Sequence, residues 1–166
     1  MKEPTAEQRS KIMASIHSKG TKPELMVRRY LFACGFRFRV NSKRLPGSPD
    51  IVLRKYRTCI FVNGCFWHGH ENCPKYHLPK TNVEFWDKKI ARNKQRDIEV
   101  QRKLAKMGWH VMTVWECQLD TKAKREQTLT RIEYTLNHIF LMDREVRYRL
   151  PYDTDVTMAA EEIHKG

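Results

Sequence analysis

The feature that most constrains this chain is residues 64–80, a stretch without hydrophobic periodicity that carries two glycines, two prolines, three histidines and two cysteines. Such a composition indicates a loop rather than a helix or a strand. Within it, Cys65, His70 and Cys73 follow the pattern Cys-x4-His-x2-Cys. Thiolates and imidazole in a tight loop suit tetrahedral zinc, so the sequence predicts a zinc site here.

The residues alone leave the rest of the ligand set open. On spacing, His68 and His77 compete with His70. Cys117 follows the last expected strand, and a sheet that places this strand beside the one before the loop would make Cys117 a fourth ligand. Four ligands would make a closed, structural site that pins the loop to the sheet, whereas three would leave a position open for catalysis.

Hydrophobic periodicity and capping signals predict the order helix, helix, strands, helix, strand, helix. The helices are expected at about residues 5–19, 22–34, 83–107 and 122–141, and the strands at 36–40, 50–53, 58–62 and 109–115. This order predicts an α/β fold with a mixed central β-sheet flanked by helices. Cys34 and Cys59 lie in apolar segments and are expected to fill core positions, as buried cysteines commonly do.

The chain is strongly basic, with a formal net charge of +13 and a pI of about 9.7. The excess lies in residues 1–142, since residues 143–166 are net acidic. This charge favours nucleic acid as the partner over an acidic protein or a role in solubility alone. No apolar run approaches the roughly 20 residues of a membrane span. The N-terminus shows no secretory signal, so we expect a cytosolic protein without a membrane partner.

Three residues are candidates for the chemistry of phosphodiester hydrolysis. Asp50 follows Pro49 at the start of an apolar strand, where a carboxylate either caps the loop or holds a cation. A Pro-Asp pair at a strand start resembles the motif of the nucleases named for their PD…(D/E)-x-K pattern, in which the next strand supplies an acid and a lysine. Here the next strand, 60–63, has neither. His68 is a candidate for proton transfer near neutral pH. Glu24 either completes a capping box or lies close to the site.

Two aromatic pairs stand in polar surroundings, Phe66-Trp67 in the loop and Phe85-Trp86 at the start of the long helix. They either pack as a small satellite of the core or insert between base steps of a DNA duplex. Because the chain is strongly basic, the sequence supports insertion into DNA as strongly as packing against the core.

The chain resembles the very short patch repair (Vsr) endonucleases over about residues 5–140. The matching blocks stand in the same order and at near-constant spacing: Arg9 to Met13, Leu45 to Val52, Phe61 to His70, Asn82 to Ile90, and Gly108-Trp109 with Val114 to Cys117. The run Gly-Cys-Phe-Trp-His at residues 64–68 is highly specific. Asn63 stands where some relatives have histidine, and Glu71-Asn72 where some have a shorter His-rich run.

The resemblance implies a restriction-endonuclease-like core with a structural Zn²⁺ and a catalytic Mg²⁺. The implied zinc ligands are Cys65, His70, Cys73 and Cys117. Asp50 and the backbone carbonyl of Val62 are the implied Mg²⁺ ligands. His68 is the implied catalytic histidine, and Glu24 an acidic group near the site.

The same resemblance implies how such a chain acts on DNA. Phe66, Trp67 and Trp86 would wedge into the duplex from the major groove, and Met13 and Ile16 would contact it from the minor groove. One strand would be hydrolysed 5′ to the thymine of a T·G mismatch, which arises when 5-methylcytosine deaminates.

The implied setting is a monomer in the cytoplasm of a bacterium, at the nucleoid, with mismatch-repair proteins and a cognate cytosine-5 methyltransferase system as associated partners. Residues 1–142 would form the endonuclease domain, including a DNA-contacting helix at about 5–19, and residues 143–166 a C-terminal extension. Two alternatives remain from the residues: a restriction-type nuclease that cuts both strands, and a zinc-stabilised DNA-binding module without catalysis.

Overall fold

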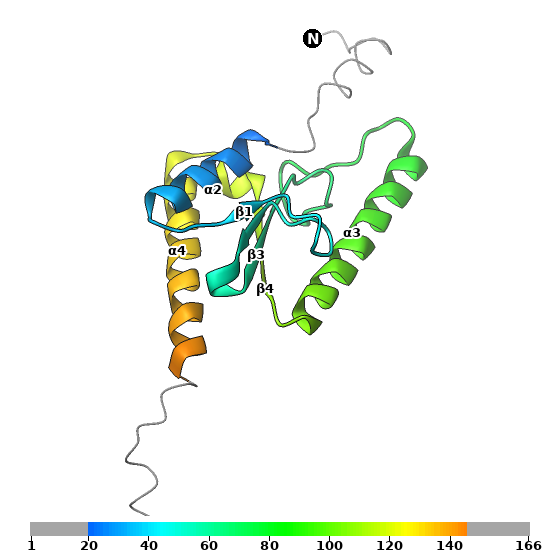
Figure 1. Ribbon diagram of the computed structural model, residues 1–166. Helices are drawn as coiled ribbons and strands as arrows, with labels where there is room; N and C mark the ends of the chain where they lie inside the picture. The colour runs from blue at the N-terminus through cyan, green and yellow to red at the C-terminus, as the bar shows by residue number, and fades with distance from the viewer. Residues whose placement is uncertain (1–19, 146–166) are drawn as a thin grey trace, which may run out of the picture.

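A single mixed sheet organises the part of the chain that the computed structural model describes, residues 20–145. The elements follow the chain as α2 (Lys22–Ala33), β1 (Arg39–Val40), β2 (Ile51–Leu53), the short 3-10 helix η1 (Arg54–Tyr56), β3 (Thr58–Asn63), α3 (Val83–Lys106), β4 (His110–Trp115), the 3-10 helix η2 (Glu116–Leu119) and α4 (Lys122–Glu145). Helices α2 and α4 lie on one side of the sheet and α3 on the other (Figure 1). This is the predicted α/β architecture.

The strand order in the sheet is β1-β2-β3-β4. The first three strands are antiparallel neighbours, and β3 and β4 run parallel along their full length, from the pair Thr58 and His110 to the pair Asn63 and Trp115. Helix α3 makes the crossover that a parallel pair requires. The C-terminal ends of β3 and β4 therefore lie side by side at one edge of the sheet.

Two apolar layers hold the helices against the sheet. The larger layer packs α2 and α4 on the sheet, with Leu31, Ile60 and Leu136 fully buried. The smaller layer lies under α3, where Leu104 packs against Val52 and Cys59. Successive strand residues point to opposite faces, which is why neighbouring residues of one strand serve different layers.

Helix α2 has well-defined signals at both ends. Thr21 and Glu24 form a capping box at its start, as the sequence predicts. At its end Gly35 has φ = +86°, and the Phe36 N–H donates to the Leu31 carbonyl at 2.9 Å. This is a Schellman motif, which turns the chain sharply out of the helix.

The motif explains one difference from the sequence-based prediction. Phe36 is buried as the hydrophobic anchor of the helix end, and only Arg39–Val40 of the predicted strand 36–40 pairs in the sheet. The prediction for Cys34 is wrong: its side chain is exposed at the helix end, whereas Cys59 is buried as predicted. Helix α4 continues to Glu145, past the predicted domain boundary at residue 142.

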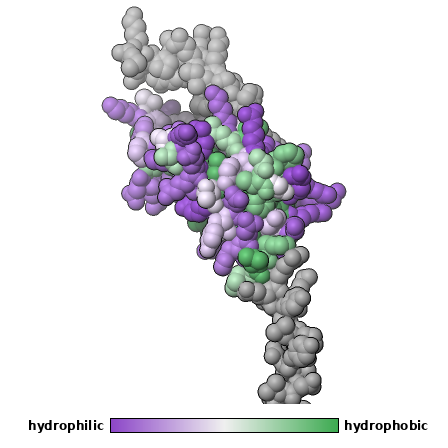
Figure 2. Space-filling view, turned by 90° about the vertical axis from the view of Figure 1, so that its left-hand side faces the viewer, coloured by the Kyte–Doolittle hydropathy of each residue, from purple (hydrophilic) through white to green (hydrophobic). Residues whose placement is uncertain are grey.

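The outer surface on the α2 and α4 side is mostly hydrophilic, with smaller groups of hydrophobic residues between the charged ones (Figure 2). Among the described residues, none of the helices has the length and apolar character needed to cross a membrane. The predicted helix at 5–19, with Met13 and Ile16, lies outside the described residues.

The burial of α4 leads to a test of the larger apolar layer. Leu136→Ala, at a fully buried position, is expected to lower the free energy of unfolding by about 2–5 kcal/mol because it leaves a cavity between α4 and the sheet. Leu141→Ala is the matched control on the same helix, since that side chain is 59% exposed. Urea denaturation of the two variants measures the difference, and equal losses would contradict the packing described.

Candidate active site and metal centre

Four side chains that are far apart in the sequence meet at the edge of the sheet where β3 and β4 end. Cys65 follows β3, His70 and Cys73 lie in the loop after it, and Cys117 lies in η2 just after β4. Their ligand atoms all lie within 4.8 Å of one another. The parallel register of Asn63 with Trp115 brings the two strand ends, and so Cys65 and Cys117, together.

The cluster fits a tetrahedral zinc ion. The Cys65 and Cys117 sulfurs each lie 3.5 Å from His70 Nδ1. Zinc bonds of about 2.3 Å to sulfur and about 2.0 Å to nitrogen, at tetrahedral angles, give a sulfur–nitrogen distance of about 3.5 Å. Burial raises the pKa of the Cys65 thiol to about 12, and a bound cation would offset that cost by stabilising the thiolate.

The His70 ring is held in place from behind. It stacks on the indole of Trp115 with ring centroids 4.1 Å apart and an angle of 3° between the planes. This contact orients Nδ1 toward the cysteines. The loop is tied to α3 as well, since Lys94 Nζ lies 2.7 Å from Glu71 Oε1.

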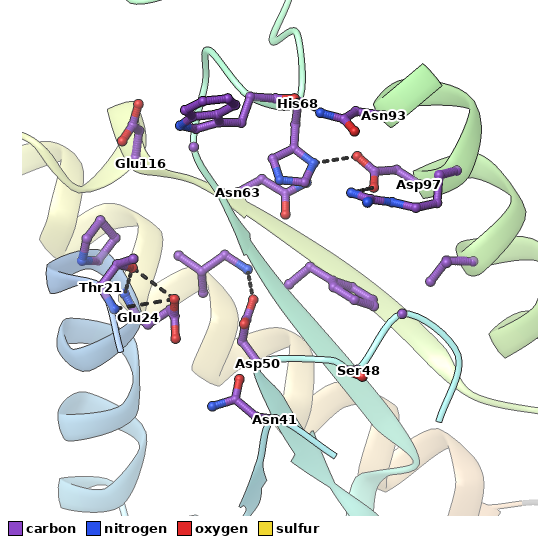
Figure 3. Close-up of a pocket in the computed structure, with 18 of the residues that line it drawn as sticks. Thr21, Glu24, Asn41, Ser48, Asp50, Asn63, His68, Asn93, Asp97 and Glu116 are labelled. Atoms are coloured by element: carbon purple, nitrogen blue, oxygen red, sulfur yellow. Dashed lines mark hydrogen bonds and ion pairs between the residues drawn. The ribbon is translucent and has the colours of Figure 1, made fainter. Parts of the chain in front are cut away.

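Beside this cluster lies a pocket of about 860 Å³ that opens between α2, the ends of the strands and α3. Asp50 and Glu24 enter it from the side of α2, and His68, Asn93 and Asp97 line it on the side of α3 (Figure 3). One wall thus carries two carboxylates, and the other carries an imidazole, a carboxamide and a third carboxylate.

Asp50 stands directly before β2. Its Oδ2 accepts a hydrogen bond from the Val62 N–H at 2.8 Å. Extending the β2–β3 register by two residues from the pair Ile51 and Ile60 places Pro49 opposite Val62. Proline has no N–H, so Pro49 cannot donate to the Val62 carbonyl. The Val62 carbonyl thus has no partner from Pro49, and it and the Asp50 carboxylate are oxygen groups of the kind that could hold Mg²⁺.

The environment of Asp50 favours the binding of a cation. Burial raises the pKa of its carboxyl above the ordinary value, and the charge of Glu24 raises it further. The Val62 hydrogen bond and the charges of Arg28 and His68 act in the opposite direction. Because the net pKa is raised, the ionised carboxylate is unfavourable here without a positive charge beside it.

Glu24 is buried and fully engaged by its own helix start. Its carboxylate accepts hydrogen bonds from Gly20 N–H at 2.9 Å, from the Thr21 backbone and hydroxyl, and from Arg28 Nη2 at 2.9 Å. Arg28 Nη2 also donates to the Asp50 carbonyl at 3.1 Å. Glu24 thus has the capping role and lies at the pocket as well, which are the two predicted alternatives combined.

On the opposite wall, His68 is held by a carboxylate from α3. His68 Nδ1 lies 2.5 Å from Asp97 Oδ2. This pairing fixes the ring and leaves Nε2 as the ring nitrogen available to the pocket. Asn93, one turn before Asp97, donates from Nδ2 to the Trp67 carbonyl at 2.9 Å and steadies the same loop.

The aromatic residues of the loop and of α3 form one group, and its member Trp67 lines the pocket. Phe66, Trp67 and Trp86 have ring centroids 5.2–5.9 Å apart, and Phe85 joins them with 58% of its side chain exposed. Lys89 Nζ lies 5.3–5.5 Å from the rings of Trp67, Phe85 and Trp86. Aromatic faces and a cation are therefore presented together at the surface.

The structure brings together all the predicted site residues that it describes, and it adds others. Asp97, Asn93 and Arg28 were not predicted, although α3 carries a signal for two of them. Asn93 and Asp97 occupy positions between Ile90 and Leu104 on the helix face that is turned toward the sheet. Polar residues at helical spacing within an apolar helix face indicate a functional site. Ile98, which the sequence pattern places on the apolar face, is 45% exposed in the structure.

A carboxylate faces a carboxylate-held imidazole across one pocket of a strongly basic chain, and these features fit a hydrolytic enzyme that acts on nucleic acid. The family model of the DNA mismatch endonuclease Vsr matches residues 2–75. The type II nicking enzyme V.NmeAIP of Neisseria meningitidis is 52% identical over 77% of this chain and 91% of its own length.

Two further relatives are also named as DNA nicking or mismatch endonucleases. The type II nicking enzyme V.XorIIP of Xanthomonas oryzae is 44% identical over 76% of this chain and 92% of its own length. The DNA mismatch endonuclease Vsr of Escherichia coli is 42% identical over 70% of this chain and 74% of its own length. The chain therefore belongs to the Vsr family, whose core is restriction-endonuclease-like, and it is a strand-nicking DNA endonuclease.

Removal of one cysteine tests the metal centre. Cys117→Ala is expected to reduce bound zinc, measured by elemental analysis, from one equivalent toward none. The melting temperature should fall by about 10 °C or more, because a structural zinc contributes directly to folding. Cys34→Ala, at an exposed thiol, is the control and should retain the metal. A native protein without zinc would contradict this interpretation of the cluster.

Substitution of Asp50 tests the electrostatics of the pocket. Its raised pKa means that its contribution to stability is present below the unfolded-state pKa and is lost as the pH rises through the folded-state pKa. Asp50→Asn should therefore raise the melting temperature by a few degrees at neutral pH without divalent metal. The gain should vanish in acid below the ordinary carboxyl pKa. A variant less stable than the native chain at neutral pH would contradict the direction of the shift.

Proposed function

We propose that this endonuclease hydrolyses the phosphodiester 5′ to the thymine of a T·G mismatch in double-stranded DNA. The observation that carries the proposal is the pairing of Asp50 and Val62 on one wall of the pocket with His68 and Asp97 on the other. A nicked strand beside a mismatch is the starting point for very short patch repair, which restores the C·G pair.

Asp50 and the Val62 carbonyl would hold the Mg²⁺. They supply only two oxygen ligands, which suits an ion that keeps several waters and takes phosphate oxygens as ligands. When bound, Mg²⁺ supplies positive charge against the charge that develops on the phosphodiester. Arg28 and Glu24 keep α2 and the start of β2 in a fixed relation, so that the Asp50 carboxylate is presented in one orientation.

His68 carries the proton transfer. Asp97 binds Nδ1 and stabilises the imidazolium when the ring gains a proton, and Nε2 exchanges a proton with water or with the leaving oxygen. Asn93 holds the loop that carries this histidine. The proton-transfer group is thus positioned by α3, independently of the wall that carries Asp50.

The aromatic group supports mismatch recognition. We propose that Phe66, Trp67 and Trp86 insert between base steps from the major groove, with Met13 and Ile16 on the minor-groove side. A T·G pair is stacked and paired less firmly than a matched pair, so the cost of unstacking is lower there. Lys89, above the same rings, adds attraction for the phosphate backbone.

The Cys/His cluster supports this arrangement as a structural zinc site made by Cys65, His70, Cys73 and Cys117. Four protein ligands leave no open position for catalysis. Because the loop between two of its ligands carries His68 and the wedge residue Trp67, the zinc would fix both groups relative to the sheet.

The biological setting follows from the proposed substrate. Since one chain supplies both walls of the pocket, we propose that a monomer acts, at the nucleoid in the bacterial cytoplasm. Its associated partners would be mismatch-repair proteins and the cytosine-5 methyltransferase whose product gives rise to the mismatch. We propose residues 1–142 as the endonuclease domain and 143–166 as an extension.

Nicking of strand-labelled duplexes tests the proposal. With Mg²⁺, the native chain should cut only the strand with the mismatched thymine in a T·G duplex, and should leave the matched C·G duplex intact. Asp50→Ala and His68→Ala should each lower the single-turnover rate by about 100-fold or more while the duplex still binds.

The controls are the same substitutions on α4, remote from the pocket. Asp143→Ala and His138→Ala should nick at the native rate. Cutting of both strands of a matched duplex would show a restriction-type nuclease instead. Tight mismatch binding with no cleavage by the native chain would show a recognition module without catalysis.

A further inference from the structure

The pocket extends past Asp50 and His68 to a second end. This end, which we call the loop end, is lined by residues of the loop between β1 and β2 and by residues of α3: Asn41, Gly47, Ser48, Val100 and Gln101. Figure 3 shows Asn41 and Ser48 on the side of Asp50 that is turned away from His68. A pocket of about 860 Å³ has the volume of sites that enclose whole drug-sized ligands. It therefore has room for a neighbouring nucleotide as well as for the scissile phosphodiester.

The backbone at the loop end is held tightly against α3. Gly47 has φ = +71°, and a Cβ there would lie 2.5 Å from Val100 Cγ1, so the close approach requires glycine. Ser48 follows with φ = +49°, a left-handed conformation that is uncommon for serine. Its N–H donates to the Leu45 carbonyl at 3.1 Å. Such conformations cost stability and are concentrated at functional sites, so the strain at Ser48 points to a role in binding.

Two polar side chains at the loop end are available to a ligand. The Ser48 hydroxyl and the Asn41 carboxamide form no hydrogen bond with another residue of 20–145. Neither group is sealed inside the protein, because in that range Arg28 Nε is the one buried side-chain nitrogen or oxygen without a partner. The Asn41 N–H donates to the Asp50 carbonyl at 3.4 Å, and Ser48 precedes Asp50 by two residues. Both side chains therefore belong to segments that meet at Asp50.

The chemistry of the loop end suits a phosphate. None of the residues that define it is acidic. Arg96 lines the pocket one helical turn before Val100, and its side chain is 62% exposed, with Nη2 3.7 Å from Asp97 Oδ1. Hydroxyl, carboxamide and guanidinium groups are side-chain donors that bind the phosphate oxygens of DNA. The loop end thus offers two neutral donors, with a cation nearby.

The proposed cut determines which phosphate reaches the loop end. The strand on the 3′ side of the scissile bond carries the mismatched thymine, so it runs toward the aromatic group that includes Trp86. Trp86 lies in the first turn of α3, Asp97 near its middle and Gln101 one turn later. One turn is about 5.4 Å, and the rise of one nucleotide along a duplex, about 3.4 Å, is of the same order. The strand on the 5′ side therefore runs toward the loop end.

We infer that the loop end binds the phosphodiester one nucleotide 5′ to the scissile bond, with the Ser48 hydroxyl and the Asn41 carboxamide as hydrogen-bond donors. This inference rests on the proposed function, which sets the direction of the strand. The contact holds the strand on one side of the reacting group, and the aromatic group holds it on the other. It is equally strong in the ground state and the transition state, so its loss weakens binding and leaves the saturated rate unchanged.

The substitution Ser48→Gly separates this role from a structural one. Glycine adopts positive φ without strain, so the melting temperature should equal or exceed that of the native chain. The dissociation constant for the T·G duplex, measured without divalent metal, should rise about 10-fold because a hydrogen bond to a charged oxygen is lost. The single-turnover rate at saturating enzyme with Mg²⁺ should stay within about twofold. Ser42→Gly, in the same loop but outside the pocket, is the matched control and should bind with native affinity.

A chemically modified duplex identifies the phosphate. A methylphosphonate in place of the phosphodiester one nucleotide 5′ to the scissile bond removes the charge and one acceptor oxygen. It should weaken binding by the native chain about 10-fold or more, and binding by Ser48→Gly several-fold less, because the two changes remove the same contact. A methylphosphonate one nucleotide 3′ to the scissile bond is the control, and should weaken binding by both chains equally.

Equal penalties for the native chain and Ser48→Gly at the 5′ position would overturn the inference. Native affinity with a lowered melting temperature in Ser48→Gly would do the same, since it would show a structural serine. If the native chain nicks the T·G duplex 5′ to the thymine in either case, the proposed function stands and the inference alone fails. Failure of the native chain to nick there would overturn the proposed function and the inference with it.

Discussion

The parallel pairing of β3 with β4 is the constraint on which the rest of this structure depends. Its register ends at the pair Asn63 and Trp115, so the segments that follow the two strands leave the sheet at the same point. Cys65 and Cys117 come from these two segments, and so does the hydrogen bond from the Cys65 N–H to Glu116 Oε1 at 3.0 Å. A shift of the register by one residue would separate the cluster and turn each strand residue to the opposite face.

The pocket combines a chain of high positive charge with a local concentration of acids. The net charge of +13 favours the binding of DNA, while Glu24, Asp50, Asp97 and Glu116 all line the pocket. Two of these acids are paired, Glu24 with Arg28 and Asp97 with His68. Among residues 20–145, the Asp50 carboxylate accepts a hydrogen bond only from the Val62 N–H, and its pKa is raised, chiefly by burial. A cation bound beside Asp50 would offset the cost of this burial.

Much of the fold could be predicted from the sequence because its signals are local. The capping box of α2, the hairpin of β2 and β3, and the long helices follow from spacing and turn residues. The metal cluster could be predicted in part, since three members lie within nine residues of one another. Cys117 could be predicted only as a possible fourth ligand, because its position depends on which strand the last strand pairs with, and the register of β3 with β4 brings it to the loop.

The remaining parts of the site depend on contacts that spacing alone does not show. Asp97 lies 29 residues from His68 in the chain, and Arg28 reaches Asp50 from 22 residues away. The Schellman motif at Gly35 redirects the chain, which shortens the predicted strand and leaves Cys34 exposed. The two pairings in the pocket thus depend on tertiary packing, whereas the strand is shortened by a local motif at the helix end.

The most direct measurement of the central claim is a kinetic double-mutant cycle between the two walls of the pocket. Single-turnover nicking of the T·G duplex is compared for Asp50→Asn, His68→Asn and the double variant. If the two walls act on one phosphodiester as a unit, the double variant should be no slower than the slower single variant. Losses that multiply, as for two independent sites, would contradict the account.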